Sequence, residues 1–133
     1  MATVKRVFAT VATLLETALY GGSAAVIAAD QDYDYTGDVD LETDGMYGTH
    51  VTSEFRGSNA KDDLIVDVFA SLDGATYDTE PIQHHIIKNT GKAQQYSIVV
   101  KDVAHFRIGL KGSDTNTTFE YQVVYQSWNE SSA

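Results

Sequence analysis

The residues best able to do chemistry are four histidines, and their spacing argues against a shared metal ion. His50, His84, His85 and His105 form neither an H-x-x-x-H nor an H-E-x-x-H arrangement. Consecutive side chains of a strand point to opposite sides, so His84 and His85 cannot bind one ion together. His50 and His105 fall on the polar sides of alternating segments, where solvated or hydrogen-bonded histidines are usual. We therefore expect no metal site and no cofactor.

A run of acids at the start of the polar part of the chain raises the question of calcium. Its members include Asp30, Asp32, Asp34, Asp38 and Asp40. An EF-hand loop that starts at Asp30 needs glycine at its sixth position and glutamate at its twelfth, where this chain has Tyr35 and Leu41. The motif fails, which leaves two hypotheses: a calcium site built from loop oxygens, and a solvated acidic loop.

Residues that could act as catalytic nucleophiles have no recognisable setting. The chain has no cysteine, which excludes thiol catalysis and cysteine-ligated zinc. It has no G-x-S-x-G motif and no glycine-rich phosphate loop. Acids are so abundant that no pair of carboxylates stands out as an acid and a base. We predict no catalytic residues and expect that the chain is not an enzyme.

Aromatic residues offer one further kind of chemistry, the stacking of sugar rings. Five tyrosines are candidates for a sugar-binding face: Tyr33, Tyr35, Tyr47, Tyr77 and Tyr125. Alternating tyrosines on strands are equally ordinary in the packing of a β-sandwich. Because these five are scattered over turns and strands, we interpret them as packing residues.

The balance of charge limits the partners of the chain. It has 133 residues, 9 Lys+Arg against 19 Asp+Glu, and a net charge of −10. Such a chain lacks the clustered cations that bind nucleic acid or an anionic membrane, so neither is expected as a partner. The charge is uneven: residues 1–29 contain Lys5, Arg6 and Glu16, and the acids lie almost entirely in residues 30–133. We predict an apolar arm at 1–29 and a domain at 30–133.

The segment 1–29 has several possible roles. Its positive start and apolar run resemble a secretory signal, but Glu16 interrupts the run. The apolar spacing suits one face of a helix that would end at Gly21 and Gly22, whereas the many valines and threonines favour a strand from Val4 to Val11. The segment either packs on its own domain or docks on a partner. The candidate docking residues are Val4, Val7, Phe8, Val11, Leu14, Leu15 and Leu19.

The rest of the chain alternates between apolar and polar residues with a period of two, which predicts strands. The expected strands lie at 26–28, 39–41, 47–55, 64–70, 82–87, 96–101, 105–110 and 119–126. Asp73 and Gly74 predict a hairpin turn after the apolar run 64–70, which we expect to be covered on both faces. This pattern predicts an all-β fold, an antiparallel β-sandwich or jelly roll of about seven or eight strands, with an N-terminal arm or short helix.

Several short segments resemble small β-sandwich virion structural proteins of tailed bacteriophages, the capsid-decoration and tail-associated proteins. They are Asp40-Leu41 followed by Gly45–Val51, the stretch Val66–Gly74 with Tyr77-Asp78 after it, Ala104–Gly109 and Tyr125–Trp128. The resemblance covers residues 38–128 and leaves out the segment 1–29. It implies a protein that binds and does not catalyse, located in the virion.

The function expected from this resemblance is assembly. The chain would decorate or cement a capsid, or act as an adaptor at the head–tail junction or in the tail. Its partners would be other virion proteins, and it would form a homo-oligomer, since virion parts occupy symmetric positions. The alternative is a carbohydrate-binding β-sandwich module for adsorption to a host surface, because fold does not determine function.

Overall fold

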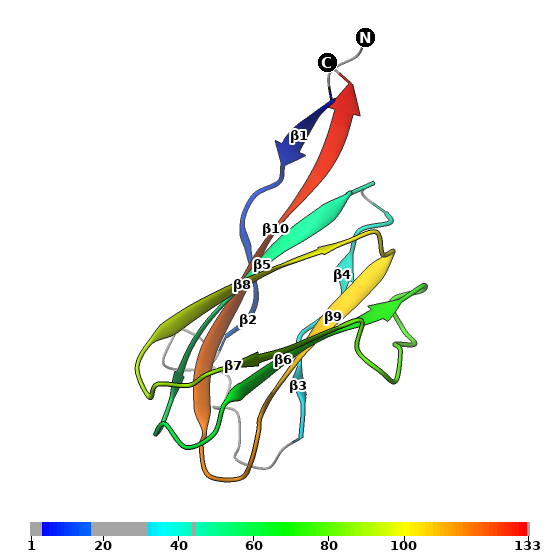
Figure 1. Ribbon diagram of the computed structural model, residues 1–133. Coiled ribbons are helices and arrows are strands. Elements are labelled where there is room, and N and C mark those ends of the chain that lie inside the picture. Colours follow the sequence, from blue (N-terminus) through cyan, green and yellow to red (C-terminus); the bar gives the residue numbers. More distant parts are fainter. Residues whose placement is uncertain (1–3, 17–31, 44, 133) are drawn as a thin grey trace.

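Two antiparallel sheets face each other in the computed structural model, which describes residues 4–16, 32–43 and 45–132 (Figure 1). The described residues form ten strands and no helix, so the predicted all-β sandwich is confirmed. Consequently, no helix in the described part of the chain is long and apolar enough to span a membrane. The expected strand at 26–28 lies outside the described residues.

The first sheet has the strand order β1-β10-β5-β8, and β2 also pairs with β10. Its strands are β1 (Val4–Phe8), β2 (Ala12–Glu16), β5 (Gly48–Gly57), β8 (Gln94–Lys101) and β10 (Phe119–Ser132). The second sheet has the order β3-β9-β6-β7, and β4 also pairs with β9. Its strands are β3 (Asp34–Tyr35), β4 (Val39–Asp40), β6 (Leu64–Ser71), β7 (Gln83–Ile87) and β9 (His105–Gly112).

The core lies between the sheets and follows the predicted alternation. On β5, Val51 and Phe55 are fully buried, whereas His50 is exposed. On β9, Phe106, Ile108 and Leu110 are fully buried and face the same core. The residues that alternate with them along β9 therefore lie on the outer face of the second sheet: His105, Arg107, Gly109 and Lys111. This outer face carries the candidate site.

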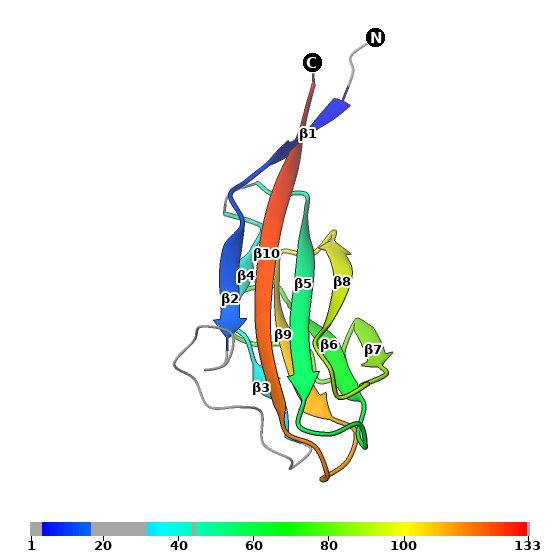
Figure 2. The same cartoon turned by 90° about the vertical axis from the view of Figure 1, so that its left-hand side faces the viewer.

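The described part of the N-terminal segment is extended, which decides between the helix and the strand. β1 and β2 both pair with β10 on the same edge, so they complete the first sheet. The pairing of β5 with β10 ends at Gly48 and Trp128, whereas β1 pairs with β10 from Trp128 to Ser132. Beyond Trp128, β1 and the end of β10 therefore project from the sandwich as a two-stranded ribbon (Figures 1 and 2).

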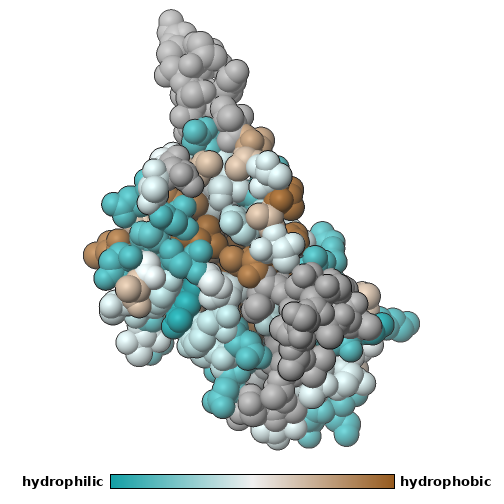
Figure 3. Space-filling model, turned by 180° about the vertical axis from the view of Figure 1, so that it is seen from behind, coloured by the Kyte–Doolittle hydropathy of each residue, from teal (hydrophilic) through white to brown (hydrophobic). Residues whose placement is uncertain are grey.

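The candidate docking residues fall into three groups. Phe8 and Val11 are exposed, each with 57% of its surface accessible, whereas Leu14 is partly buried against the core of its own domain. For Val4, Val7 and Leu15 only the backbone is described, and Leu19 lies outside the described residues. Seen from behind the view of Figure 1, the middle of the molecule shows hydrophobic side chains at its surface (Figure 3). The boundary predicted after residue 29 also lies outside the described residues.

The predicted hairpin turn at Asp73 and Gly74 is present, and it lies in the connection between the antiparallel strands β6 and β7. Gly74 has φ +76°, and Asp73 Oδ1 accepts hydrogen bonds from the backbone N–H groups of Ala75 and Thr76. These bonds close a local turn, and Ser71 forms only an isolated bridge with Tyr77. The next strand begins at Gln83, so residues 72–82 form a longer loop over the end of the second sheet.

Candidate binding face

The outer face of the second sheet combines aromatic, cationic and acidic side chains. The strand register places Tyr35, Gly109, Asp67 and His84 in one row across β3, β9, β6 and β7. A second row pairs Arg107 with Phe69, and a third joins Lys111, Ile65 and Ile86. Directly opposed residues of antiparallel strands share a face, so these side chains form one surface.

The aromatic rings of this face lie over Gly109. The rings of Tyr33 and Tyr35 are 5.5 Å apart, and both meet the ring of Phe69, at 5.3 Å and 5.7 Å. A Cβ atom at Gly109 would lie 2.8 Å from Tyr33 Cδ1 and 3.0 Å from Phe69 Cε2. The rings can therefore occupy this place only because residue 109 has no side chain. Tyr35 keeps 41% of its surface exposed.

Asp67 is a buried acid beneath this aromatic group. It has only 1% of its surface exposed although it belongs to the outer face. The Tyr33 hydroxyl donates a hydrogen bond to Asp67 Oδ2, and His84 Nδ1 lies 2.5 Å from Oδ1. Burial, followed by the hydrogen bond to Asp67, raises the pKa of Tyr33 above its usual value. Asp67 thus anchors the ring of Tyr33, just before β3, and a histidine of β7.

Two cations lie on the aromatic rings. The guanidinium of Arg107 lies 3.7 Å from the ring centre of Tyr35 and 4.2 Å from that of Tyr77. Lys111 Nζ lies 4.2 Å from the ring centre of Tyr33. Cation–π contacts of this kind contribute about 0.5–1 kcal/mol at exposed sites and about 2 kcal/mol or more when desolvated. Together, Arg107, Tyr35, Tyr77, Tyr33 and Lys111 form what we call the cation–aromatic strip.

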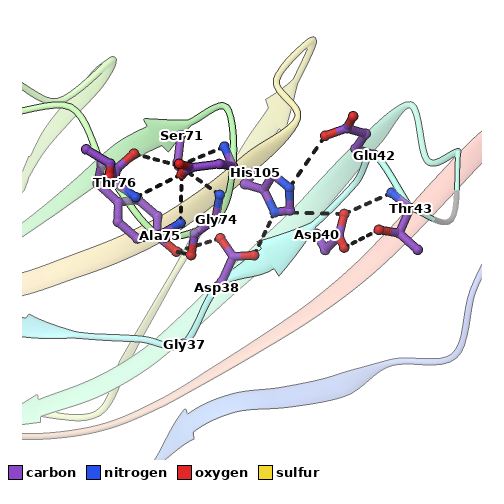
Figure 4. Close-up of polar contacts among 12 residues, drawn as sticks. Gly37, Asp38, Asp40, Glu42, Thr43, Ser71, Gly74, Ala75, Thr76 and His105 are labelled. Atoms are coloured by element: carbon purple, nitrogen blue, oxygen red, sulfur yellow. Dashed lines mark hydrogen bonds and ion pairs between the residues drawn. The ribbon is translucent and has the colours of Figure 1, made fainter.

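A polar cluster around His105 borders the strip (Figure 4). His105 Nδ1 lies 2.7 Å from Asp38 Oδ2 and 3.8 Å from Asp40 Oδ1, and its Nε2 lies 3.6 Å from Glu42 Oε2. The Tyr77 hydroxyl donates a 2.6 Å hydrogen bond to Asp38 Oδ1. Burial and this bond raise the pKa of Tyr77 to about 12, so its hydroxyl remains a donor at neutral pH. Asp38 thereby joins the loop 72–82 to the start of β9.

His105 should make the stability of the domain depend on pH. The hydrogen bond to Asp38, with the charges of three nearby acids, raises the pKa of His105 above its usual value of about 6.5. A raised pKa in the folded state stabilises the domain fully below the unfolded pKa, and this stabilisation is lost as the pH rises through the folded pKa. We expect the stability difference between wild type and His105→Gln to be largest below about pH 6.5 and to shrink above it.

Urea unfolding from pH 5.5 to 8.5 measures this dependence, and His50→Gln is the control because His50 is exposed on the other sheet. A difference between wild type and His105→Gln that stays constant over this range would contradict the expected role of His105.

The structure changes the interpretation of the tyrosines. Tyr33, Tyr35 and Tyr77 lie on one face, although their places in the sequence had suggested scattered packing residues. Tyr47 instead lies 6.4 Å from Trp128, and Tyr125 packs against the core. The prediction for the histidine pair is confirmed: His84 bonds Asp67 on the outer side, and His85 bonds Tyr96 on the other. Among the described residues, no group of three or more His, Asp or Glu side chains is arranged to hold a metal ion.

Sequence reasoning missed Asp67, Phe69, Arg107, Gly109 and Lys111. Asp67 was the one polar residue in an apolar run that was expected to be covered on both faces, and this was the signal for a buried, bonded acid. A glycine, Gly109, within the alternating strand at 105–110 was the signal for a close approach of other side chains.

Comparisons with known proteins support the fold of the chain and assign it to no family. No family model matches the chain, and no curated protein matches its sequence. A family two carbohydrate esterase from Cellvibrio japonicus is structurally similar, with a TM-score of 0.51 and 12% identity over 98% of this chain. The chain spans 35% of the length of that protein.

A second similar structure matches the chain over nearly its whole length. The CBM36-1 domain of a multidomain xylanase from the hindgut metagenome of Trinervitermes trinervoides has a TM-score of 0.50 and 10% identity. The match covers 92% of this chain and 96% of that domain. At such low identity these likenesses support the β-sandwich fold alone. The resemblance to virion proteins stays a prediction.

Proposed function

We propose that this chain is a carbohydrate-binding domain without catalytic activity, and that it binds sugar on the outer face of the second sheet. The observation that carries the proposal is that Tyr35, with 41% of its surface exposed, lies within a group of aromatic and polar side chains. The flat side of a sugar ring is apolar and stacks on aromatic rings, while its hydroxyls need donors and acceptors at the edge. Arg107, Lys111 and His84 can supply such contacts.

The similar structures support the same class of function. One is a carbohydrate esterase, and the other is the CBM36-1 domain of a multidomain xylanase. Both names refer to carbohydrate chemistry, but at 12% and 10% identity to this chain they transfer no site. The site proposed here therefore rests on the geometry of this chain.

Tyr35→Ala tests the proposal. Burial of an aromatic ring against sugar stabilises a complex by about 1.5–3 kcal/mol, so the loss of Tyr35 should lower the affinity by about tenfold or more. Affinity electrophoresis through gels that contain soluble polysaccharides, followed by calorimetry on those that retard the protein, measures the change.

Tyr47→Ala is the matched control, because Tyr47 has a similar exposed fraction, 37% against 41%, but lies next to Trp128 away from this face. The proposal would be rejected if no polysaccharide retarded the wild type, or if both variants bound equally well.

Assembly into a phage particle is the second candidate, and the projecting ribbon favours it. A two-stranded ribbon buries little apolar surface and is marginally stable on its own in water. A neighbouring virion protein, or a second copy of the chain, would cover the exposed Phe8 and Val11 near its base. Recovery of the chain from purified phage particles would favour this candidate, and its absence from them would count against it.

A further inference from the structure

Arg107 carries hydrogen-bond donors that no described residue uses. Its guanidinium is held between the rings of Tyr35 and Tyr77, and its Nε is buried without a partner. None of the described carboxylates forms an ion pair with Arg107 or Lys111, whereas Arg56 on the other sheet pairs with Glu120 at 3.0 Å. Lys61, Lys88, Lys92 and Lys101 likewise form no ion pair with a described carboxylate, so Arg107 is distinguished by its place between two rings and by its buried, unpartnered Nε.

Two of the acids nearest to the strip already have partners. Asp67 is bound by Tyr33 and His84, and Asp38 is bound by Tyr77 and His105. Glu80 adds a negative field near Tyr33. Since neither Asp67 nor Asp38 turns to Arg107 or Lys111, these cations can bind an anion from outside.

We propose that the sugar bound by this face carries carboxylate groups, as in a polymer of uronic acids, and that Arg107 binds one of those carboxylates. This inference rests on the proposed sugar-binding function and names its ligand class. The planar fork of a guanidinium matches a carboxylate with two parallel hydrogen bonds. The two flanking rings hold the guanidinium in place and exclude water, which strengthens its bond to an anion.

Lys111, the second cation of the strip, lies on the same strand as Arg107 and far enough from it to contact another unit of a sugar chain. Arg107 and Lys111 are four residues apart on β9, which corresponds to about 13 Å at a rise of about 3.3 Å per residue. The rings of Tyr35 and Tyr33 lie between them. A chain of acidic sugars laid along the strip would meet a cation, two rings and a second cation in turn.

The net charge of the chain opposes a polyanion at long range, so the contacts must be local. The acidic part of the chain repels an approaching polyanion, and salt at physiological strength screens this repulsion beyond about 8 Å. Direct ion pairs within the strip are screened much less. We therefore expect the preference for acidic sugars to persist at physiological salt.

The experiment compares polygalacturonate with the same polymer after chemical reduction of its carboxyl groups. Calorimetry is carried out with wild type, Arg107→Gln and Lys111→Gln, and with Arg56→Gln as a control that changes the net charge equally. We expect wild type to bind the acidic polymer about tenfold or more tightly than the reduced one, since hydrogen bonds to charged groups are the strong ones. Arg107→Gln should abolish this preference, Lys111→Gln should reduce it, and Arg56→Gln should keep it.

The remaining outcomes separate the two proposals. Equal or tighter binding of the reduced polymer by wild type would overturn the inference and leave the proposed sugar binding intact. Equal behaviour of Arg107→Gln and Arg56→Gln would overturn the role of Arg107. Absence of binding to any polysaccharide would overturn both proposals. Because Arg107→Gln could loosen the strip, Arg107→Lys, which keeps the charge without the fork, should lose most of the preference while its thermal unfolding stays close to that of wild type.

Discussion

Replacement of Gly109 by alanine is expected to destabilise the domain by about 1–3 kcal/mol and to lower its affinity for sugar by about tenfold or more. The new Cβ would lie 2.8 Å from Tyr33, 3.0 Å from Phe69 and 3.2 Å from Tyr35. Phe69 is buried and cannot retreat, so the two tyrosine rings must move away from the sheet. Such a shift removes the surface on which a sugar would stack and the support of Arg107.

The predicted loss of stability is opposite in sign to the usual effect of replacing a strand glycine by alanine. Alanine in a strand is favoured over glycine by about 0.5–1 kcal/mol when nothing obstructs its Cβ. Gly37→Ala, in the link between β3 and β4, is the control for the loss of a glycine without a clash, because a Cβ at Gly37 meets no atom within 4 Å. Urea unfolding and sugar titration of both variants measure the effect. If Gly109→Ala were as stable as wild type, the rings would adjust freely and would not form a fixed binding surface.

Much of the fold could be predicted from the sequence because the strands alternate regularly. The core residues of β5 and β9 follow a period of two, and each such strand must bury one side. The N-terminal strands were ambiguous, because Val and Thr residues at helical spacing satisfy both patterns. Pairing with β10 resolved that ambiguity, and such pairing depends on residues more than a hundred positions away.

The binding face could not be predicted in the same way. Tyr33 and Tyr35 belong to an acidic run whose strand, β3, has only two residues, so no local pattern indicates where their rings lie. Their position depends on the register of β3 with β9, which sets Tyr35 against Gly109. The charge difference between residues 1–29 and the rest does not indicate where the N-terminal strands pair. β1 and β2 are strands of the same sandwich as the acidic residues.

Removal of the Asp67 carboxylate is the second change with a large expected effect. Asp67→Ala should destabilise the domain by about 2–4 kcal/mol, because it deletes a buried acceptor of two hydrogen bonds and leaves their donors without a partner. Asp67→Asn keeps the volume, but its amide group replaces one acceptor by a donor, so it should also destabilise the domain. In Asp67→Ala Tyr33 loses its acceptor, and in Asp67→Asn it loses the charge of that acceptor, so we expect the affinity for sugar to fall with the stability, and further in the alanine variant.

A double-mutant cycle with Tyr33→Phe separates this bond from the general loss of an acid. Tyr33 and Asp67 in direct contact should show a coupling energy of about 1 kcal/mol or more, whereas the effects of independent sites add within about 0.5 kcal/mol.

The pKa of Tyr33 offers a second measurement. Loss of the bond and charge of Asp67 should bring this raised pKa down toward the usual value, so that one tyrosine ionises earlier in an ultraviolet titration of Asp67→Asn. Asp114→Asn, in an exposed loop, is the control for charge alone. Additive energies together with an unchanged titration would show that Asp67 does not hold Tyr33, and the strip would then lack the fixed support that sugar binding on this face requires.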